Sequence, residues 1–143
     1  MDPRSLIDRL GLERHPEGGW FRETWRAPDG AGTAIYYLLE AGDRSHWHRV
    51  LGATEVWHHY AGGALRLSVS SDGVTADDLV LGLDVAAGQR PQLTVAAGAW
   101  QSAIPLGEWV LAGCTVSPAF DFSRFVLAPP GWAPSRAADR PRS

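Results

Sequence analysis

The amino-acid sequence predicts an all-β protein, a two-sheet jelly roll with one short helix at its N-terminus. Short apolar or alternating runs recur along the chain, and turns rich in Gly or Pro separate them. Helical spacing of apolar residues is confined to a stretch near the start. About ten short strands joined by tight turns favour an antiparallel sandwich or barrel, and the jelly roll suits that number best.

The first part of the chain contains the helix and two strands. Residues 3–10 predict a helix that opens on Pro, carries apolar residues at helical spacing and stops at Gly11. Residues 15–19, His-Pro-Glu-Gly-Gly, form a turn. Residues 20–26 alternate as a half-exposed strand does, whereas residues 34–39 are continuously apolar and predict a strand buried on both faces.

The remaining predicted strands are short, and most end at a Gly or Pro turn. They cover residues 46–50, 55–60, 64–70, 79–83, 93–95, 99–104, 109–116 and 123–127. We expect residues 1–128 to form a single domain. Residues 129–143 are rich in Pro, Arg and Ala with little to bury, which predicts a disordered tail.

Composition narrows the classes of partner. The net charge is −3 and the basic residues are dispersed, which argues against a nucleic-acid partner. The apolar runs are shorter than the ~18 residues that a membrane helix needs, and the N-terminus has no apolar signal core. The single Cys114 predicts a cytoplasmic protein without an intrachain disulfide. Seven Trp fit either a barrel filled by large rings or a cavity lined by them.

Residues 42–62 carry the densest chemistry, with four of the five histidines, a carboxylate between them and two tryptophans. Two short strands cross this stretch, and alternate side chains of a strand share one face. Five side chains are expected to point inward: His46 and His48 from the first strand, and Glu55, Trp57 and His59 from the second. Gln101 approaches the same place from a third strand.

The spacing of this stretch resembles the first motif of the cupins, which is Gly, five residues, His-x-His, three or four residues, Glu, six residues, Gly. Gly42, His48, Glu55 and Gly62 occupy its positions, and Val50 stands where the second His is expected. The second cupin motif is Pro-x-Gly, two residues, His. Here it reads Ala96-Ala97-Gly98-Ala99-Trp100-Gln101, so that Gln101 occupies the His position.

Other segments resemble a small cupin family whose members are mostly of unknown function. These segments cover residues 10–24, 35–39, 48–50, 55–62, 97–101 and 113–118, nearly the whole chain before the tail. The resemblance implies a cupin jelly-roll barrel (double-stranded β-helix), usually dimeric, and no settled reaction. Cupins include dioxygenases, isomerases, epimerases and binding proteins, so the fold does not give the function.

Two alignments of the histidines stay open. The cupin spacing makes His48 the first ligand position, whereas the local pair His46-x-His48 requires a β-bulge before Glu55. Nitrogen and oxygen donors of His46, His48 and Glu55 would suit a divalent metal, Zn, Mn, Fe or Ni. With Val and Gln at ligand positions, a metal-free acid–base pair of His48 and Glu55 is the competing interpretation.

The resulting hypothesis is a homodimeric cupin that binds a small polar molecule, sugar-like or a secondary-metabolite intermediate, and isomerises or epimerises it by proton transfer. His48 and Glu55 would be catalytic, and four residues would contact the ligand: Trp57, His59, Trp100 and Gln101. By strict alternation Trp100 faces away from Gln101. The alternatives are a metal-dependent oxygenase and a non-catalytic binding protein.

Overall fold

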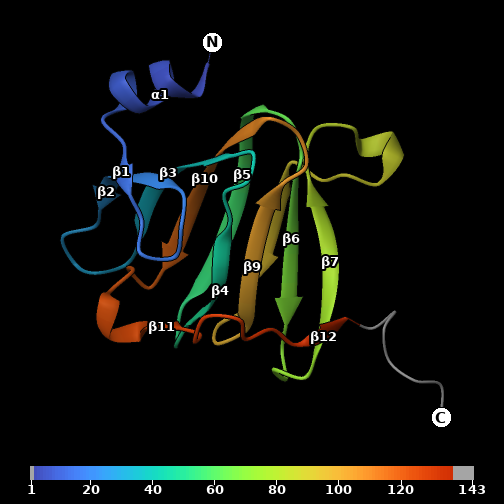
Figure 1. Ribbon diagram of the computed structural model, residues 1–143. Coiled ribbons are helices and arrows are strands. Elements are labelled where there is room, and N and C mark those ends of the chain that lie inside the picture. Colours follow the sequence, from blue (N-terminus) through green and yellow to red (C-terminus); the bar gives the residue numbers. More distant parts are fainter. Residues whose placement is uncertain (1, 137–143) are drawn as a thin grey trace.

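The computed structural model describes residues 2–136 and contains two six-stranded sheets within that range (Figure 1). The elements follow in chain order as α1 (Pro3–Leu10), β1 (Glu13–Arg14), β2 (Trp20–Arg26), β3 (Thr33–Glu40), β4 (Ser45–Val50), β5 (Thr54–Gly62), β6 (Leu65–Ser70), β7 (Thr75–Leu81), η1 (Val85–Ala87), β8 (Gln92–Val95), β9 (Trp100–Pro105), β10 (Trp109–Ser117), η2 (Phe122–Arg124), β11 (Phe125–Leu127) and β12 (Ser135–Arg136). The predicted all-β jelly roll with a short N-terminal helix is confirmed.

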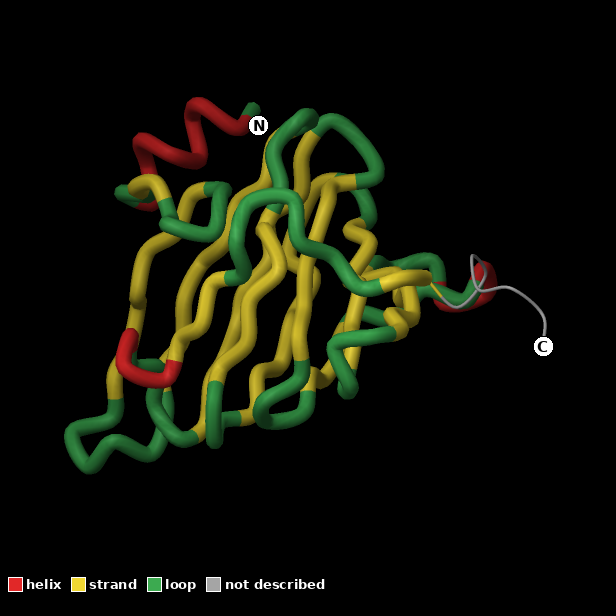
Figure 2. Tube along the Cα trace, turned by 60° about the horizontal axis from the view of Figure 1, so that its bottom comes forward, coloured by secondary structure: helices red, strands yellow, loops and turns green. Residues whose placement is uncertain are grey.

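The strand order explains how segments distant in sequence come together. One sheet has the order β1-β2-β3-β10-β5-β8, and the other has the order β11-β4-β9-β6-β7-β12. Consecutive strands β4 and β5 therefore lie in different sheets. Most pairings are antiparallel, and Figure 2 shows the loops gathered at the strand ends. This arrangement lets side chains from β4, β5 and β9 face a common interior.

The main core lies between the two sheets. Large apolar side chains from both sheets fill it, among them Tyr37, Leu39, Trp57, Leu65 and Leu67. Burial of this surface from water is the main source of stability in such a fold. The interior therefore consists largely of packed apolar side chains, and a group of polar side chains is buried among them.

Helix α1 covers the outer face of the first sheet (Figure 1). The Asp2 side chain accepts the Ser5 N–H at 2.9 Å as an N-cap, and Gly11 ends the helix with a φ of 66°. Leu6 of the helix packs against Leu38 of β3. Because Leu38 faces the helix while its neighbours in β3 face the barrel, the prediction that this strand is buried on both sides is confirmed.

The C-terminal segment differs from the sequence-based expectation. Residues 129–136 lie along the second sheet, and β12 pairs in parallel with β7. The Trp132 ring packs 6.1 Å from that of Trp47 and 4.6 Å from that of Trp100. A disordered tail is therefore wrong for these residues, because one large indole anchors a segment that is otherwise poor in apolar groups. The rest of the predicted tail, 137–143, lies outside the described residues.

Smaller differences concern strand limits. Strand β7 covers Thr75–Leu81 rather than 79–83, because its Asp-rich first half still pairs with β6. Residues 122–124 form the 3-10 turn η2 rather than the start of a strand. No helix between residues 2 and 136 is long and apolar enough to span a membrane.

Candidate functional site

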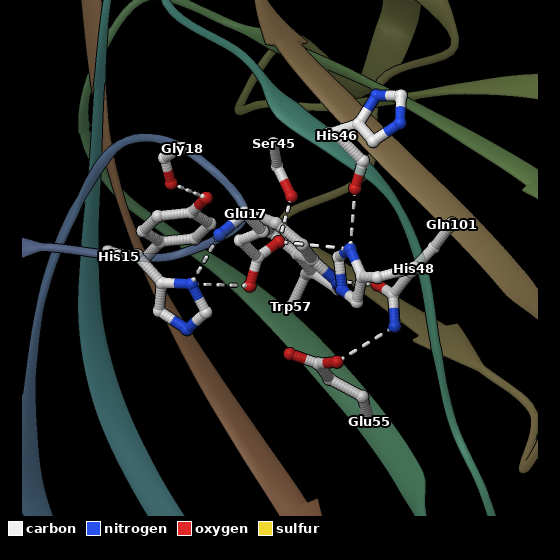
Figure 3. A network of polar contacts seen from close by, with 10 residues as sticks. His15, Glu17, Gly18, Ser45, His46, His48, Glu55, Trp57 and Gln101 are labelled. Carbon is white, nitrogen blue, oxygen red and sulfur yellow. Dashed lines mark hydrogen bonds and ion pairs between the residues drawn. The ribbon is translucent and has the colours of Figure 1, made fainter. Parts of the chain in front are cut away.

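A cluster of buried polar side chains lies inside the barrel, between the two sheets (Figure 3). Strand β4 supplies His48, β5 supplies Glu55, and β9 supplies Gln101, which pairs with His48 in register. The turn between β1 and β2 supplies His15 and Glu17. All five side chains are nearly inaccessible to solvent, so their hydrogen bonds decide which of them carries a proton.

Glycines allow the turn of residues 15–19 to enter the barrel. Gly19 has a φ of 78°, and a Cβ there would lie 2.6 Å from the Tyr37 ring. A Cβ on Gly18 would overlap the backbone carbonyl oxygen of Arg44. No larger residue fits either position without moving a strand, so the Gly pair is what brings Glu17 into the interior.

The His48 imidazole is held in one tautomer. Its Nδ1 lies 2.8 Å from the backbone carbonyl oxygen of His46 and 3.0 Å from Oε2 of Glu17. A carbonyl oxygen can only accept, so we assign the ring proton to Nδ1. In the neutral ring Nε2 then carries the free lone pair. Burial lowers the pKa of His48 below its ordinary value, and the charge of Glu55 opposes that shift.

Glu17 is arranged as a neutral carboxylic acid. Its own backbone N–H donates to Nδ1 of His15 at 3.1 Å, so that nitrogen carries a lone pair. Oε1 of Glu17 lies 3.3 Å from the same nitrogen, which is favourable when Oε1 bears the proton. Oε2 accepts from the Ser45 hydroxyl and faces the His48 N–H. Burial raises the pKa of Glu17 to about 8, and burial lowers that of His15 to about 3.

Glu55 is fixed by a short chain of hydrogen bonds. Nε1 of Trp57 donates to Oε1 of Gln101 at 2.8 Å, and Nε2 of Gln101 donates to Oε1 of Glu55 at 2.8 Å. An indole N–H can only donate, so the orientation of the amide follows from chemistry. Burial raises the pKa of Glu55, although the nearby His48 opposes the shift.

These groups close the inner end of a cavity of about 410 Å³. Five buried polar residues line it: His15, Glu17, Thr33, His48 and Glu55. Its walls are aromatic, from Phe21, Phe120, Phe122 and Phe125, and aliphatic, from Ile35, Val50 and Val116. Exposed Glu23, Arg26 and Asp121 mark the mouth. The volume is in the range of small-molecule sites.

Both residues predicted to be catalytic, His48 and Glu55, line this cavity. The place of His48 in the cavity agrees with the alignment that makes it the first cupin ligand position. His48 and Glu55 face the cavity together with Val50, which leaves an apolar wall where the alignment expects a second imidazole. Trp57 and Gln101, predicted to contact the ligand, are buried beside Glu55 and do not line the cavity. Their role in the structure is to orient the Glu55 carboxyl group.

Three predicted residues lie elsewhere, which corrects their placement. The register of β4 against β9 shifts between Ser45 and His48, so His46 turns outward and its Nε2 lies 3.0 Å from the carbonyl oxygen of Pro129 (Figure 3). His59 does not line the cavity, and its Nε2 lies 2.9 Å from the Gly63 carbonyl oxygen. Trp100 stacks on Trp132 and on the Arg49 guanidinium, so its predicted direction away from Gln101 is confirmed.

Sequence reasoning missed Glu17 and the aromatic wall. The Gly pair that follows Glu17 is a signal for a tight turn, but periodicity does not report that a loop carboxyl group enters a barrel. The three phenylalanines of residues 120–125 lie in a loop, a 3-10 turn and a very short strand, where no alternation predicts their direction. His15 belongs to the predicted turn of residues 15–19, and its Nδ1 accepts the Glu17 N–H.

The donor set does not fit a cupin metal. Within residues 2–136, no three His, Cys, Asp or Glu side chains are arranged to hold an ion. Val50 offers no donor atom, and Gln101 turns its N–H groups, rather than its oxygen, toward Glu55. His46 is directed outside. Two donors, His48 and Glu55, are fewer than the three protein ligands that an open metal site ordinarily uses.

Comparison with known proteins places the fold in a family. The family model described as Cupin superfamily (DUF985) matches residues 4–128. The chain belongs to this cupin family. Among curated protein sequences, none matches the chain.

Solved structures of other cupins share the fold. A Shewanella oneidensis protein is 36% identical, with 90% of this chain and 85% of that one covered and a TM-score of 0.84. A hypothetical protein from Leishmania major is 28% identical, with 92% and 90% covered and a TM-score of 0.82. A mutant of Bacillus subtilis oxalate decarboxylase is 15% identical, with 80% and 29% covered and a TM-score of 0.62, which is a likeness of fold alone.

Proposed function

We propose that this cupin binds a small molecule in the cavity and moves a proton on it, as an isomerase or epimerase does. The observation that supports this most is the fixed tautomer of His48. Its Nδ1 is committed to the His46 carbonyl oxygen and Glu17, which leaves Nε2 as the proton acceptor on the cavity side. A general base must be unprotonated and within reach of the substrate, and this arrangement meets the first requirement.

The proposed reaction uses His48 and Glu55 as a base and an acid. Nε2 of His48 removes a proton from a carbon next to a carbonyl group, and the Glu55 carboxyl group gives its proton to the carbonyl oxygen. The enol that forms returns its O–H proton to Glu55 and regains a proton at carbon, either at the neighbouring position from the protonated His48 or on the opposite face from water, which then recovers a proton from His48. The product is an isomer or epimer, so atoms and electrons balance without an oxidant.

The electrostatics favour these two roles at neutral pH. Burial lowers the pKa of His48, which keeps the base free, and burial raises the pKa of Glu55, which favours its acid form. Gln101 donates to Oε1 of Glu55, so Oε2 is the oxygen that we expect to carry the transferable proton. Paired groups whose pKa values are shifted for opposite roles are typical of acid–base sites.

Solvent exchange tests the proposal. In deuterium oxide, the protein should catalyse deuterium incorporation at the carbon next to the carbonyl of a bound ketone, followed by proton NMR. We expect His48→Gln to slow this exchange by about 100-fold or more, in line with the usual contribution of a general base. His58→Gln is the matched control, because His58 contacts Thr115 rather than the cavity. Saturable binding of ketones with no exchange above background in the unaltered protein would instead support a non-catalytic binding protein.

The oxygenase alternative has weaker support. It needs a metal, and the donor set at the inner end does not suit one. The oxalate decarboxylases resemble this chain at 13–15% identity, which carries no reaction across. Proton transfer by His48 and Glu55 is therefore the function that the geometry favours.

A further inference from the structure

The walls of the cavity differ in character from its inner end, and this contrast bears on the ligand. The titratable groups are concentrated at His15, Glu17, His48 and Glu55, and Thr33 is the one further buried polar residue in the lining. Away from them the lining is carbon over most of its extent, and the Phe125 ring lies 5.4 Å from the His48 ring and 5.8 Å from that of Phe120. A ligand that fills the cavity therefore meets hydrogen-bonding groups at one end and hydrocarbon along its length.

A sugar does not suit such walls. Hydroxyl groups of a polyol that face the phenyl rings and the aliphatic side chains would leave water without a protein partner to replace their hydrogen bonds. The one hydroxyl group among the buried lining residues belongs to Thr33, which already accepts the Phe120 N–H at 3.0 Å. Val50 also makes the lining near His48 apolar, because it places a branched hydrocarbon side chain where the cupin spacing expects an imidazole.

A charged acid does not suit the inner end either. The four titratable residues there include two carboxyl groups and no lysine or arginine. The guanidinium group of Arg26 lies at the mouth and is already bound, to Glu23 at 2.7 Å and to the Phe120 carbonyl oxygen at 2.8 Å. A buried carboxylate without a cationic partner is strongly disfavoured.

The volume of the cavity limits the size of the ligand. A cavity of about 150 Å³ lined by hydrocarbon is enough for one benzene molecule. The cavity here measures about 410 Å³, so it accepts one substituted ring or two fused rings.

From these observations we propose that the ligand is a neutral ketone or enol built on one or two hydrocarbon rings, with its oxygen at Glu55, the C–H next to its carbonyl group at Nε2 of His48, and its rings between the phenylalanines. This substrate class rests on the proton-transfer function proposed above, because the carbonyl group and its adjacent C–H are what those two residues would act on. It replaces the sugar-like ligand that the sequence suggested.

Three probes of similar reach separate the ligand classes. We would titrate 2-tetralone (neutral, two rings, one ketone), 2-naphthoate (the same two rings with a negative charge) and methyl glucoside (a neutral polyol), and follow each by calorimetry. Saturable binding of 2-tetralone with binding of the other two at least tenfold weaker is the expected result. Preferred binding of methyl glucoside or 2-naphthoate, or no saturable binding of 2-tetralone at millimolar concentration, would overturn the proposal.

Val50→Thr localises the binding with little change of shape. The variant replaces a methyl group of a cavity-lining residue by a hydroxyl group that the hydrocarbon rings cannot hydrogen-bond, so 2-tetralone should bind roughly tenfold more weakly. Val126→Thr, on the neighbouring strand β11 and exposed, is the matched control and should bind as the unaltered protein does. Equal binding by both variants, with both still folded, would show that the rings lie elsewhere and would overturn the proposal.

The same experiment keeps the two proposals apart. Deuterium exchange into 2-tetralone is measured beside its binding, with the uncatalysed rate subtracted. Binding without catalysed exchange would leave the ligand class standing and remove the proton-transfer function. Catalysed exchange in a polyol ketone such as fructose, with no binding of 2-tetralone, would leave the proton-transfer function standing and remove the ligand class.

Discussion

At the scale of single residues, Glu17 directs the hydrogen bonds of the site. As a neutral acid it places Oε1 3.3 Å from Nδ1 of His15, which accepts the Glu17 N–H, and it presents Oε2 as an acceptor to Ser45 and His48. That acceptor supports the N–H at Nδ1 of His48 and so the free lone pair at Nε2. A glutamine has the same pattern, an N–H donor beside a carbonyl acceptor, which makes the role of the proton testable.

We predict that Glu17→Gln is stable and changes the pH dependence of folding. The folded protein holds the Glu17 proton up to about pH 8, whereas the unfolded chain releases it near the ordinary value of 4.5. Raising the pH through this window therefore destabilises the unaltered protein through this group and leaves the glutamine variant unaffected. Relative to the unaltered protein, the variant should gain on the order of 1–3 kcal/mol between pH 5 and 8.5.

Urea unfolding at the two pH values measures this difference in the free energy of unfolding. Both proteins contain His15 and His48, so the contribution of these histidines largely cancels when the two proteins are compared. A variant that loses stability relative to the unaltered protein as the pH rises would mean that Glu17 is ionised in the folded state.

At the scale of elements, the C-terminal segment of residues 129–136 acts as a strap over the second sheet. Trp132 lies against Trp47 and Trp100, and the Ala128 N–H donates to the Trp47 carbonyl oxygen at 3.0 Å. The carbonyl oxygen of Pro129 meets the His46 ring. The strap thus covers the outer side of the strand whose inner side holds His48.

Trp132→Ala should weaken this strap. Removing a partly buried indole that packs on two others should lower the free energy of unfolding by about 2 kcal/mol. Ser135→Ala, an exposed position of the same segment, should change it by less than about 0.5 kcal/mol. Denaturant unfolding followed by tryptophan fluorescence compares the two, and equal stability of both variants would mean that the strap adds nothing.

These elements also show what the sequence could and could not foretell. Strand β2 and helix α1 match their predicted limits, because alternation and helical spacing are local signals. The strap and the loop with Glu17 were missed, since a single Trp or Glu acts there through contacts far away in sequence. His46 was misplaced for a related reason, because a register shift in one strand pair reverses the direction of a side chain.

At the scale of the whole molecule, carbon packing holds the barrel together, and the polar site is a small group inside it. The main core joins both sheets, and further clusters bind α1 and the strap to their outer faces. Trp25 and Tyr60 are more than half exposed on strands β2 and β5, as an interface between copies would require. The homodimer and the cytoplasmic location stay predictions.

Because packing rather than ligation holds the fold, we predict that chelation leaves stability unchanged. Protein purified without a histidine tag and dialysed against EDTA should keep its melting temperature within about 1 °C, and adding Mn²⁺ or Zn²⁺ at a low excess should not raise it. A metal that bound the folded state alone would shift this temperature by mass action. A drop of about 5 °C or more on chelation, reversed by one metal, would contradict the donor set described here.

The proton acceptor at Nε2 of His48 underlies both the proposed reaction and the proposed ligand, and nitrogen NMR observes it directly. In protein labelled with ¹⁵N-histidine, the His48 ring is identified as the signal pair lost in His48→Gln. At pH 7 we predict a neutral ring with a protonated Nδ1 and an unprotonated Nε2, because burial lowers the pKa of His48 below its ordinary value. A ring protonated at Nε2, or at both nitrogens, at pH 7 would contradict this structure of the site.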